Sequence, residues 1–145
     1  MPIHEKKYEQ VILYLCSKLD SEIRGKKRLA KLLYYADFDY FEKNNESITG
    51  EVYRALPMGP FPLALEDVVK KMIKDGKLEY RKIEEHTGYN PTETFRCLIE
   101  PNNSVLNEDE IFILDRVIKN YGHLNGKQLE DLTHAEAPYV ATKPQ

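Results

Sequence analysis

The 145-residue sequence has few of the features that mark a disulfide scaffold, a membrane protein or a secreted protein. Its two cysteines, Cys16 and Cys97, are too few for a disulfide framework and favour a reducing compartment. No apolar run is long enough to span a bilayer, and residues 1–9 lack the apolar segment of a secretory signal. We therefore expect a cytoplasmic protein with no membrane partner.

The residues that carry common catalytic chemistry are also missing. The four histidines stand at no helical ligand spacing, and no Cys-x-x-Cys pair is present. The sequence has no glycine-rich phosphate loop, no nucleophile-elbow serine, and no cysteine in an electropositive context. We expect no metal, no cofactor and no enzymatic activity. The histidines are His4, His86, His123 and His134.

A basic surplus is absent as well. The net charge is −3, with 41% hydrophobic and 31% charged residues, which is ordinary for one globular domain over residues 1–145. This balance argues against nucleic acid as the partner. The alternative is a winged-helix-like DNA-binding regulator, in which one group of cations would face phosphates. That group is Lys70, Lys71, Lys74, Lys77, Arg81 and Lys82.

The stretch from Leu29 to Pro62 organises the chain. Apolar residues recur there at helical spacing and predict a central core helix. Its predicted core residues are Leu29, Leu32, Leu33, Ala36, Asp37 and Tyr40. Because an unpaired buried carboxylate is costly, we expect backbone N–H groups or a cation to hold Asp37.

A strand over Ile48–Leu56 and a rigid corner over Met58–Pro62 follow this helix. Prolines fix the corner, and Gly59 is the one residue there that is free to adopt positive φ. The corner would hold Met58 and Phe61 in fixed directions. It either connects a strand to the next helix or presents a surface to a partner.

The remaining pattern predicts four more helices and two more strands. The helices are expected over His4–Leu19 and Leu63–Asp75, from Asn107 to Gly122, and from Asn125 onward. Asn107 with Glu110 forms a capping-box pattern. The strands Leu78–Ile83 and Thr94–Ile99 read as an antiparallel pair, with Ile48–Leu56 as a third strand. The fold class is therefore α+β, mostly helical, with five helices and a small antiparallel sheet.

Two surface features stay open. Lys26, Lys27 and Arg28 oppose the dipole at the start of the central helix, so they form either a solvated helix start or a small basic patch for an acidic partner. The ten tyrosines exceed what one small core needs, and tyrosine is favoured at interfaces. Our surface candidates are Tyr35, Tyr53 and Tyr139.

Four segments in order carry a resemblance to a known family. They are LLYYADF at 32–38, ITGEVYRAL at 48–56, MGPFP at 58–62, and Thr133–Tyr139 near the end. Together they resemble the Panacea domain, also called the SocA-like or GepA-like domain. In that family a "kLLYyaD" helix leads to a "tG..Y" strand, a "GP" corner and a late "sH.e..W" pattern. This chain has Tyr139 where many members have Trp.

The resemblance implies an antitoxin of a bacterial or phage toxin–antitoxin pair, which acts by binding a cognate protein toxin. Its motifs suggest that the corner and the late segment form a surface that binds the partner. His134 either belongs to this surface or has a structural role, capping a helix end or bonding to a carbonyl. The candidate residues are Met58, Gly59, Pro60, Phe61, Tyr53, His134, Glu136 and Tyr139. A monomer and a homodimer are both compatible with the sequence.

Overall fold

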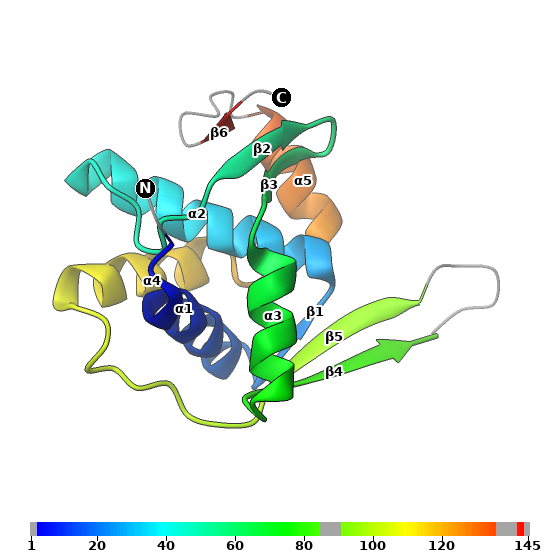
Figure 1. Cartoon of the computed structure of the whole chain (residues 1–145). Helices are drawn as coiled ribbons and strands as arrows, with labels where there is room; N and C mark the ends of the chain where they lie inside the picture. The colour runs from blue at the N-terminus through cyan, green and yellow to red at the C-terminus, as the bar shows by residue number, and fades with distance from the viewer. Residues whose placement is uncertain (1–2, 85–90, 136–141, 144–145) are drawn as a thin grey trace.

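The computed structural model describes residues 3–84, 91–135 and 142–143 (Figure 1). Helices and strands are interspersed along the chain, the strands form two small sheets, and the fold is α+β as predicted. The helices in the described part are α1 (Glu5–Lys18), α2 (Lys26–Asn44), α3 (Leu65–Lys74), α4 (Glu108–Tyr121) and α5 (Gly126–Ala135). The strands are β1 (Glu22–Arg24), β2 (Tyr53–Leu56), β3 (Gly59–Pro62), β4 (Leu78–Ile83), β5 (Thr92–Cys97) and β6 (Thr142–Lys143).

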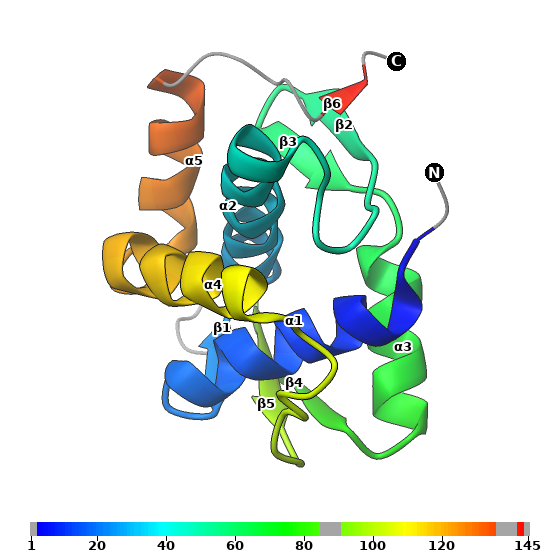
Figure 2. The same cartoon turned by 90° about the vertical axis from the view of Figure 1, so that its left-hand side faces the viewer.

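Helix α2 is the centre of the core. All six of its predicted core residues are buried, Asp37 included. Figures 1 and 2 show α2 surrounded by α1, α4, α5 and the hairpin of β2 and β3, and it contacts each of them. A helix that is apolar on two adjacent stripes needs cover from more than one side, and these neighbours supply it.

The predicted strand pair is present, but the predicted third strand is wrong. β4 and β5 pair antiparallel, and β1 pairs with the other edge of β5, giving the order β1-β5-β4. β1 is three residues long, and only Ile23 of it is buried. So short a strand shows no alternation in sequence, and its partner lies about seventy residues away in the chain. Of the predicted strand Ile48–Leu56, only Tyr53–Leu56 is a strand, and it belongs to the other sheet.

The predicted corner is a hairpin rather than a turn of five residues. β2 and β3 pair antiparallel around a two-residue turn, Pro57-Met58, so the sequence prediction of a turn over Met58–Pro62 is wrong. Pro60 and Pro62 cannot donate to a ladder, but β3 is an edge strand of the order β3-β2-β6, where proline is tolerated. β6 pairs parallel with β2 on the opposite edge.

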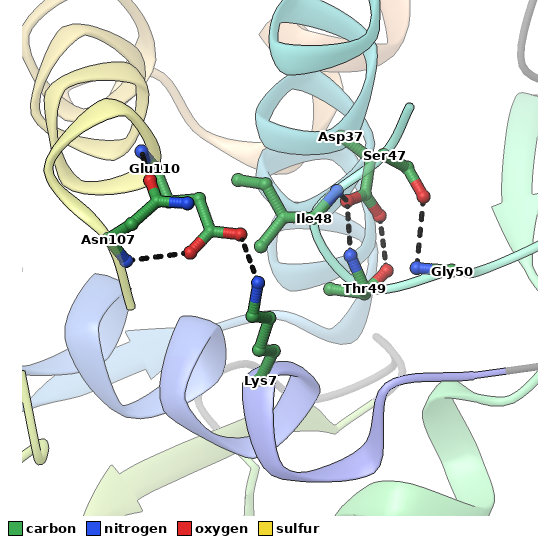
Figure 3. Close-up of polar contacts among 8 residues, drawn as sticks. All are labelled: Lys7, Asp37, Ser47, Ile48, Thr49, Gly50, Asn107 and Glu110. Carbon is green, nitrogen blue, oxygen red and sulfur yellow. Dashed lines mark hydrogen bonds and ion pairs between the residues drawn. The ribbon is translucent and has the colours of Figure 1, made fainter. Parts of the chain in front are cut away.

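The predicted capping box opens α4. The Asn107 side chain accepts from Glu110 N at 2.8 Å, and Glu110 Oε1 accepts from Asn107 N at 2.8 Å (Figure 3). Glu110 is buried, and its other carboxylate oxygen pairs with Lys7 Nζ of α1 at 2.7 Å. One residue therefore caps α4 and joins it to α1.

Asn107→Ala is expected to lower the free energy of unfolding by about 1–2 kcal/mol, because it removes the acceptor for the first turn of α4. Chemical denaturation measures the loss. Asn103→Ala, in the exposed loop before the helix, is the matched control and should change stability by less than about 0.5 kcal/mol. Equal midpoints for the two variants would contradict the role of the cap.

Candidate functional site

Asp37 is the hub of a buried polar cluster. Its Oδ1 accepts hydrogen bonds from Ile48 N and Thr49 N, both at 3.0 Å. Its Oδ2 accepts from Thr49 Oγ1 and Tyr53 OH, both at 2.6 Å. Figure 3 shows the loop after α2 folded back over the carboxylate, with Ile48 between Asp37 and Glu110. The expectation that backbone N–H groups hold Asp37 is confirmed.

The two oxygens of Asp37 meet different kinds of donor. Backbone N–H groups can only donate, whereas hydroxyls can turn and accept. Burial raises the pKa of Asp37 to about 6, against the lowering by the hydrogen bonds from Thr49, Tyr53 and Ile48. A protonated Oδ2 can donate a hydrogen bond to a hydroxyl that has turned to accept it. The cluster can therefore satisfy Asp37 both as a carboxylate and as a neutral carboxylic acid.

A second buried carboxylate extends this cluster to α1 and α3. Glu51 accepts hydrogen bonds from Tyr8 OH of α1, from Val52 N at 2.8 Å and from Ala64 N at 2.9 Å, just before α3. Burial and the charge of Glu51 raise the pKa of Tyr8, which keeps its hydroxyl protonated as a donor. The residues of the "yaD" and "tG..Y" motifs thus join α1, α2, β2 and α3.

The prediction of surface tyrosines is wrong for two of them. Tyr53 is 0% exposed, and its hydroxyl donates to Asp37 in the interior. Tyr35 is 1% exposed and stacks on Tyr121 of α4. Tyr53 therefore presents no surface to a partner. Tyr139 and Glu136 lie outside the described residues. A motif tyrosine can be an interior donor as readily as an interface residue, and periodicity does not separate the two roles.

Lys31, Gly59 and Thr133 meet at the β2–β3 hairpin. Lys31 of α2 is 3% exposed and donates from Nζ to Met58 O at 2.7 Å. Gly59 has φ +106°, and a Cβ there would lie 2.4 Å from Lys31 Nζ and 3.0 Å from Thr133 Oγ1 of α5. The positive φ therefore favours glycine, and a Cβ would in addition displace the Lys31 ammonium and press on Thr133. The corner and the start of the late motif are neighbours in the fold.

Helix α5 brings Thr133, the first residue of the late motif, to this place. Thr133 is buried and donates to Glu130 O at 2.9 Å, and Glu130 pairs with Lys27 of α2 at 2.5 Å. His134 is exposed and lies in the last turn of α5, inside the helix. The physical reason is that α5 begins at a second reciprocal cap, Asn125 with Gln128, and continues through the Thr-His-Ala segment.

A cavity of about 200 Å³ lies between the hairpin and the start of α2. We call it the hairpin groove. Three lysines of α2 and three apolar residues of the hairpin line it: Lys26, Lys27, Lys31, Leu56, Met58 and Phe61. Met58 is 53% exposed, and Phe61 is half-buried with its ring 5.8 Å from Lys26 Nζ. Pro60, which is buried, also lines the groove.

The cations proposed for the winged-helix alternative are largely paired within the chain. Lys71 pairs with Glu5, Lys77 with Glu9 at 2.7 Å, and Lys70 with Glu66 at 3.5 Å. Arg81 lies 3.5 Å from Glu79. Phosphates would have to compete with these carboxylates, so the arrangement disfavours the DNA-binding alternative.

Other kinds of site find little support in the part of the chain that the structure describes. Within residues 3–84, 91–135 and 142–143, no three His, Cys, Asp or Glu side chains gather as metal ligands would. No helix of this part combines the length and the apolar character needed to cross a membrane.

Sequence reasoning missed Lys31, Glu51 and Tyr8. Lys31 is the one cation in the apolar run from Leu29 to Ala36, and that isolation is the signal that could have singled it out. Glu51 sits in a strand-like pattern and carries no such signal. Its burial depends on a tyrosine more than forty residues earlier.

Comparison with known proteins adds a family description to this geometry. A family model described as "Antitoxin SocA-like, Panacea domain" matches residues 29–139. The matched region begins within the first turn of α2 and includes both buried carboxylates, the hairpin and α5. No curated protein and no solved structure matches the chain.

Proposed function

Because this chain belongs to the antitoxin SocA-like Panacea family, we propose that it is a non-catalytic antitoxin that neutralises a cognate protein toxin by binding it directly. The family makes an antitoxin role the expected one, and direct binding is the mechanism that the hairpin favours. We propose further that the pair acts in the cytoplasm.

One observation carries the choice of surface. The exposed side chain of Met58 sits on a two-residue turn whose backbone is fixed from below by Lys31, next to Gly59 and Thr133. A large apolar group on a rigid support loses little conformational entropy when a partner docks. Residues of this kind commonly form the centres of interfaces. Phe61 of β3 and exposed His134 of α5 complete the proposed surface.

Met58→Ala is expected to weaken binding of the toxin by about tenfold or more, because it removes the exposed anchor of the proposed surface. The toxin to test is the small protein encoded next to this chain, and calorimetry with the purified pair gives the affinity. Growth of cells that express both proteins gives a second readout, since neutralisation should weaken in parallel.

Phe112→Ala is the matched control. Phe112 is 56% exposed, close to the value for Met58, but it lies on α4. It should leave affinity unchanged, and both variants should melt at the wild-type temperature. If Met58→Ala, Phe61→Ala and His134→Ala all bind like the wild type, the hairpin is not the toxin surface. Turnover of a substrate by the purified chain would contradict the non-catalytic part of the proposal.

A further inference from the structure

The start of α2 is basic, and its first turn contains no acidic residue that would balance this charge. Lys26 is the first residue of the helix, and N-cap Gly25 offers no side-chain acceptor. The N-terminal end of a helix already favours an anion. Among the described residues, the lining of the hairpin groove has three lysines and no carboxylate. This lies on a chain whose net charge is −3.

Of the three lysines, Lys31 has the greatest need for an anionic partner. It is buried beside the groove, and within the described residues its ammonium makes one hydrogen bond, to the neutral carbonyl of Met58, and no ion pair. Burial lowers the pKa of Lys31 to about 8, while the charge of Glu130 acts in the opposite direction. An ammonium has three donors, so a further acceptor can be accommodated. A carboxylate arriving in the groove would offset the cost of burying this charge.

The other two lysines have carboxylates nearby, but these lie outside the groove lining. Lys27 pairs with Glu130, and Lys26 lies 3.7 Å from exposed Glu66, a contact that stabilises little in water. The opposite wall is apolar, from Leu56, Met58 and Phe61. The groove therefore offers a cationic wall facing an apolar wall, with room for about one or two side chains.

On the basis of the proposed function, we infer that the hairpin groove binds an acidic segment of the toxin, with a carboxylate at Lys31 and an adjacent apolar side chain against Met58 and Phe61. Opposite charge supplies specificity and the apolar contact supplies affinity. A nucleic acid would also supply negative charge. However, its backbone would not match an apolar wall, and Lys70, Lys71, Lys77 and Arg81 lie near carboxylates of the chain itself. The sequence left open whether Lys26–Arg28 form a solvated helix start or a basic patch for an acidic partner. The inferred site makes Lys26 and Lys27 part of such a patch. Arg28 instead donates to Gly122 O and Leu124 O and has a structural role.

A peptide titration tests the chemistry of the groove without the toxin. The full ¹⁵N-labelled chain is titrated with acetyl-Ala-Leu-Glu-Phe-Ala-amide and with the same peptide carrying Gln in place of Glu. The acidic peptide should shift the amide resonances of Lys31, Gly59 and Phe61, and the Gln peptide should bind about tenfold more weakly. Equal binding of the two, or shifts confined to other parts of the chain, would overturn the inference. So would a single-stranded DNA 12-mer that shifts the same resonances at lower concentration than the peptide.

The toxin itself provides the second test. Lys31→Met should weaken toxin binding by about tenfold. It loses the hydrogen bond to Met58 O but also removes the cost of burying a charge without an ion pair, so the melting temperature should change little. Lys127→Met, an exposed lysine of α5 paired with Asp131, is the control and should bind normally. If Lys31→Met fails to fold, the double variant Lys26→Gln, Lys27→Gln serves instead, since both side chains are over a third exposed.

The results separate the inference from the proposed function. Normal toxin binding by Lys31→Met, or by the double variant, overturns the inference and leaves the antitoxin proposal standing. If the wild-type chain binds no toxin but discriminates between the two peptides, the antitoxin proposal fails and the groove chemistry is supported.

Discussion

Asp37→Ala is expected to lower the free energy of unfolding by about 3–5 kcal/mol, a large part of the about 5–15 kcal/mol that holds a typical domain together. The substitution leaves four donors without an acceptor in the interior. The hydroxyls of Thr49 and Tyr53 can turn toward other partners. The backbone N–H groups of Ile48 and Thr49 cannot, and each carries the full desolvation cost of an unmade hydrogen bond. Urea denaturation monitored by circular dichroism measures the loss.

Asp37→Asn is the matched comparison, and it is expected to cost only about 1–2 kcal/mol. An amide oxygen at the Oδ1 position keeps both backbone donors satisfied. The amide nitrogen at the Oδ2 position can donate to a hydroxyl that has turned to accept. Equal losses for the two variants would contradict the division of the donors between the two oxygens. A loss below 1 kcal/mol for the alanine variant would contradict the role of the cluster altogether.

The stability of this cluster bears on how the family motifs are interpreted. Asp37, Thr49 and Tyr53 are all buried, so they act on function by holding the chain together. Toxin affinity measured per folded molecule should therefore be the same for Asp37→Asn as for the wild type. This separates the first two motifs from the hairpin, where exposed side chains are available to a partner.

The helices were predictable because their signals are local. A repeating apolar stripe predicted α2, and a four-residue pattern from Asn107 to Glu110 fixed the start of α4. The position of Asp37 near an apolar stripe was enough to predict a buried carboxylate held by backbone N–H groups or a cation, and the structure has the backbone N–H groups. The pair β4 and β5 was predictable because a short connection joins two alternating runs.

The errors arose where structure depends on distant parts of the chain. β1 is a strand only because β5 is beside it, and three residues cannot reveal this locally. β3 contains two prolines, which in the sequence indicate a turn. They are compatible with a strand only because β3 lies at the edge of its sheet, which the sequence does not show. The candidate site shows the same limit. The sequence singled out Gly59 and the late segment separately, but their contact, and the burial of Lys31 between them, follow from the packing of α5 on α2 and β3.

Gly59→Ala is the second large effect, with an expected loss of about 2–4 kcal/mol. A positive φ near +106° strains any residue with a Cβ, and this Cβ would also displace Lys31 and press on Thr133. Because Lys31 fixes the turn at Met58, the variant should also weaken toxin binding per folded molecule by about tenfold. Denaturation gives the first quantity and calorimetry the second.

Gly25→Ala separates these causes. Gly25 has nearly the same φ, +100°, but the atom nearest to its added Cβ is Arg28 Cβ at 3.8 Å, which is ordinary contact. It should lose about 1–2 kcal/mol from backbone strain alone and bind toxin normally. The difference between the two losses in free energy of unfolding then gives the cost of crowding the added Cβ against Lys31 of α2 and Thr133 of α5. If Gly59→Ala is no less stable than Gly25→Ala and binds toxin equally well, Lys31 and Thr133 can move aside freely, and the hairpin is not held rigid for a partner.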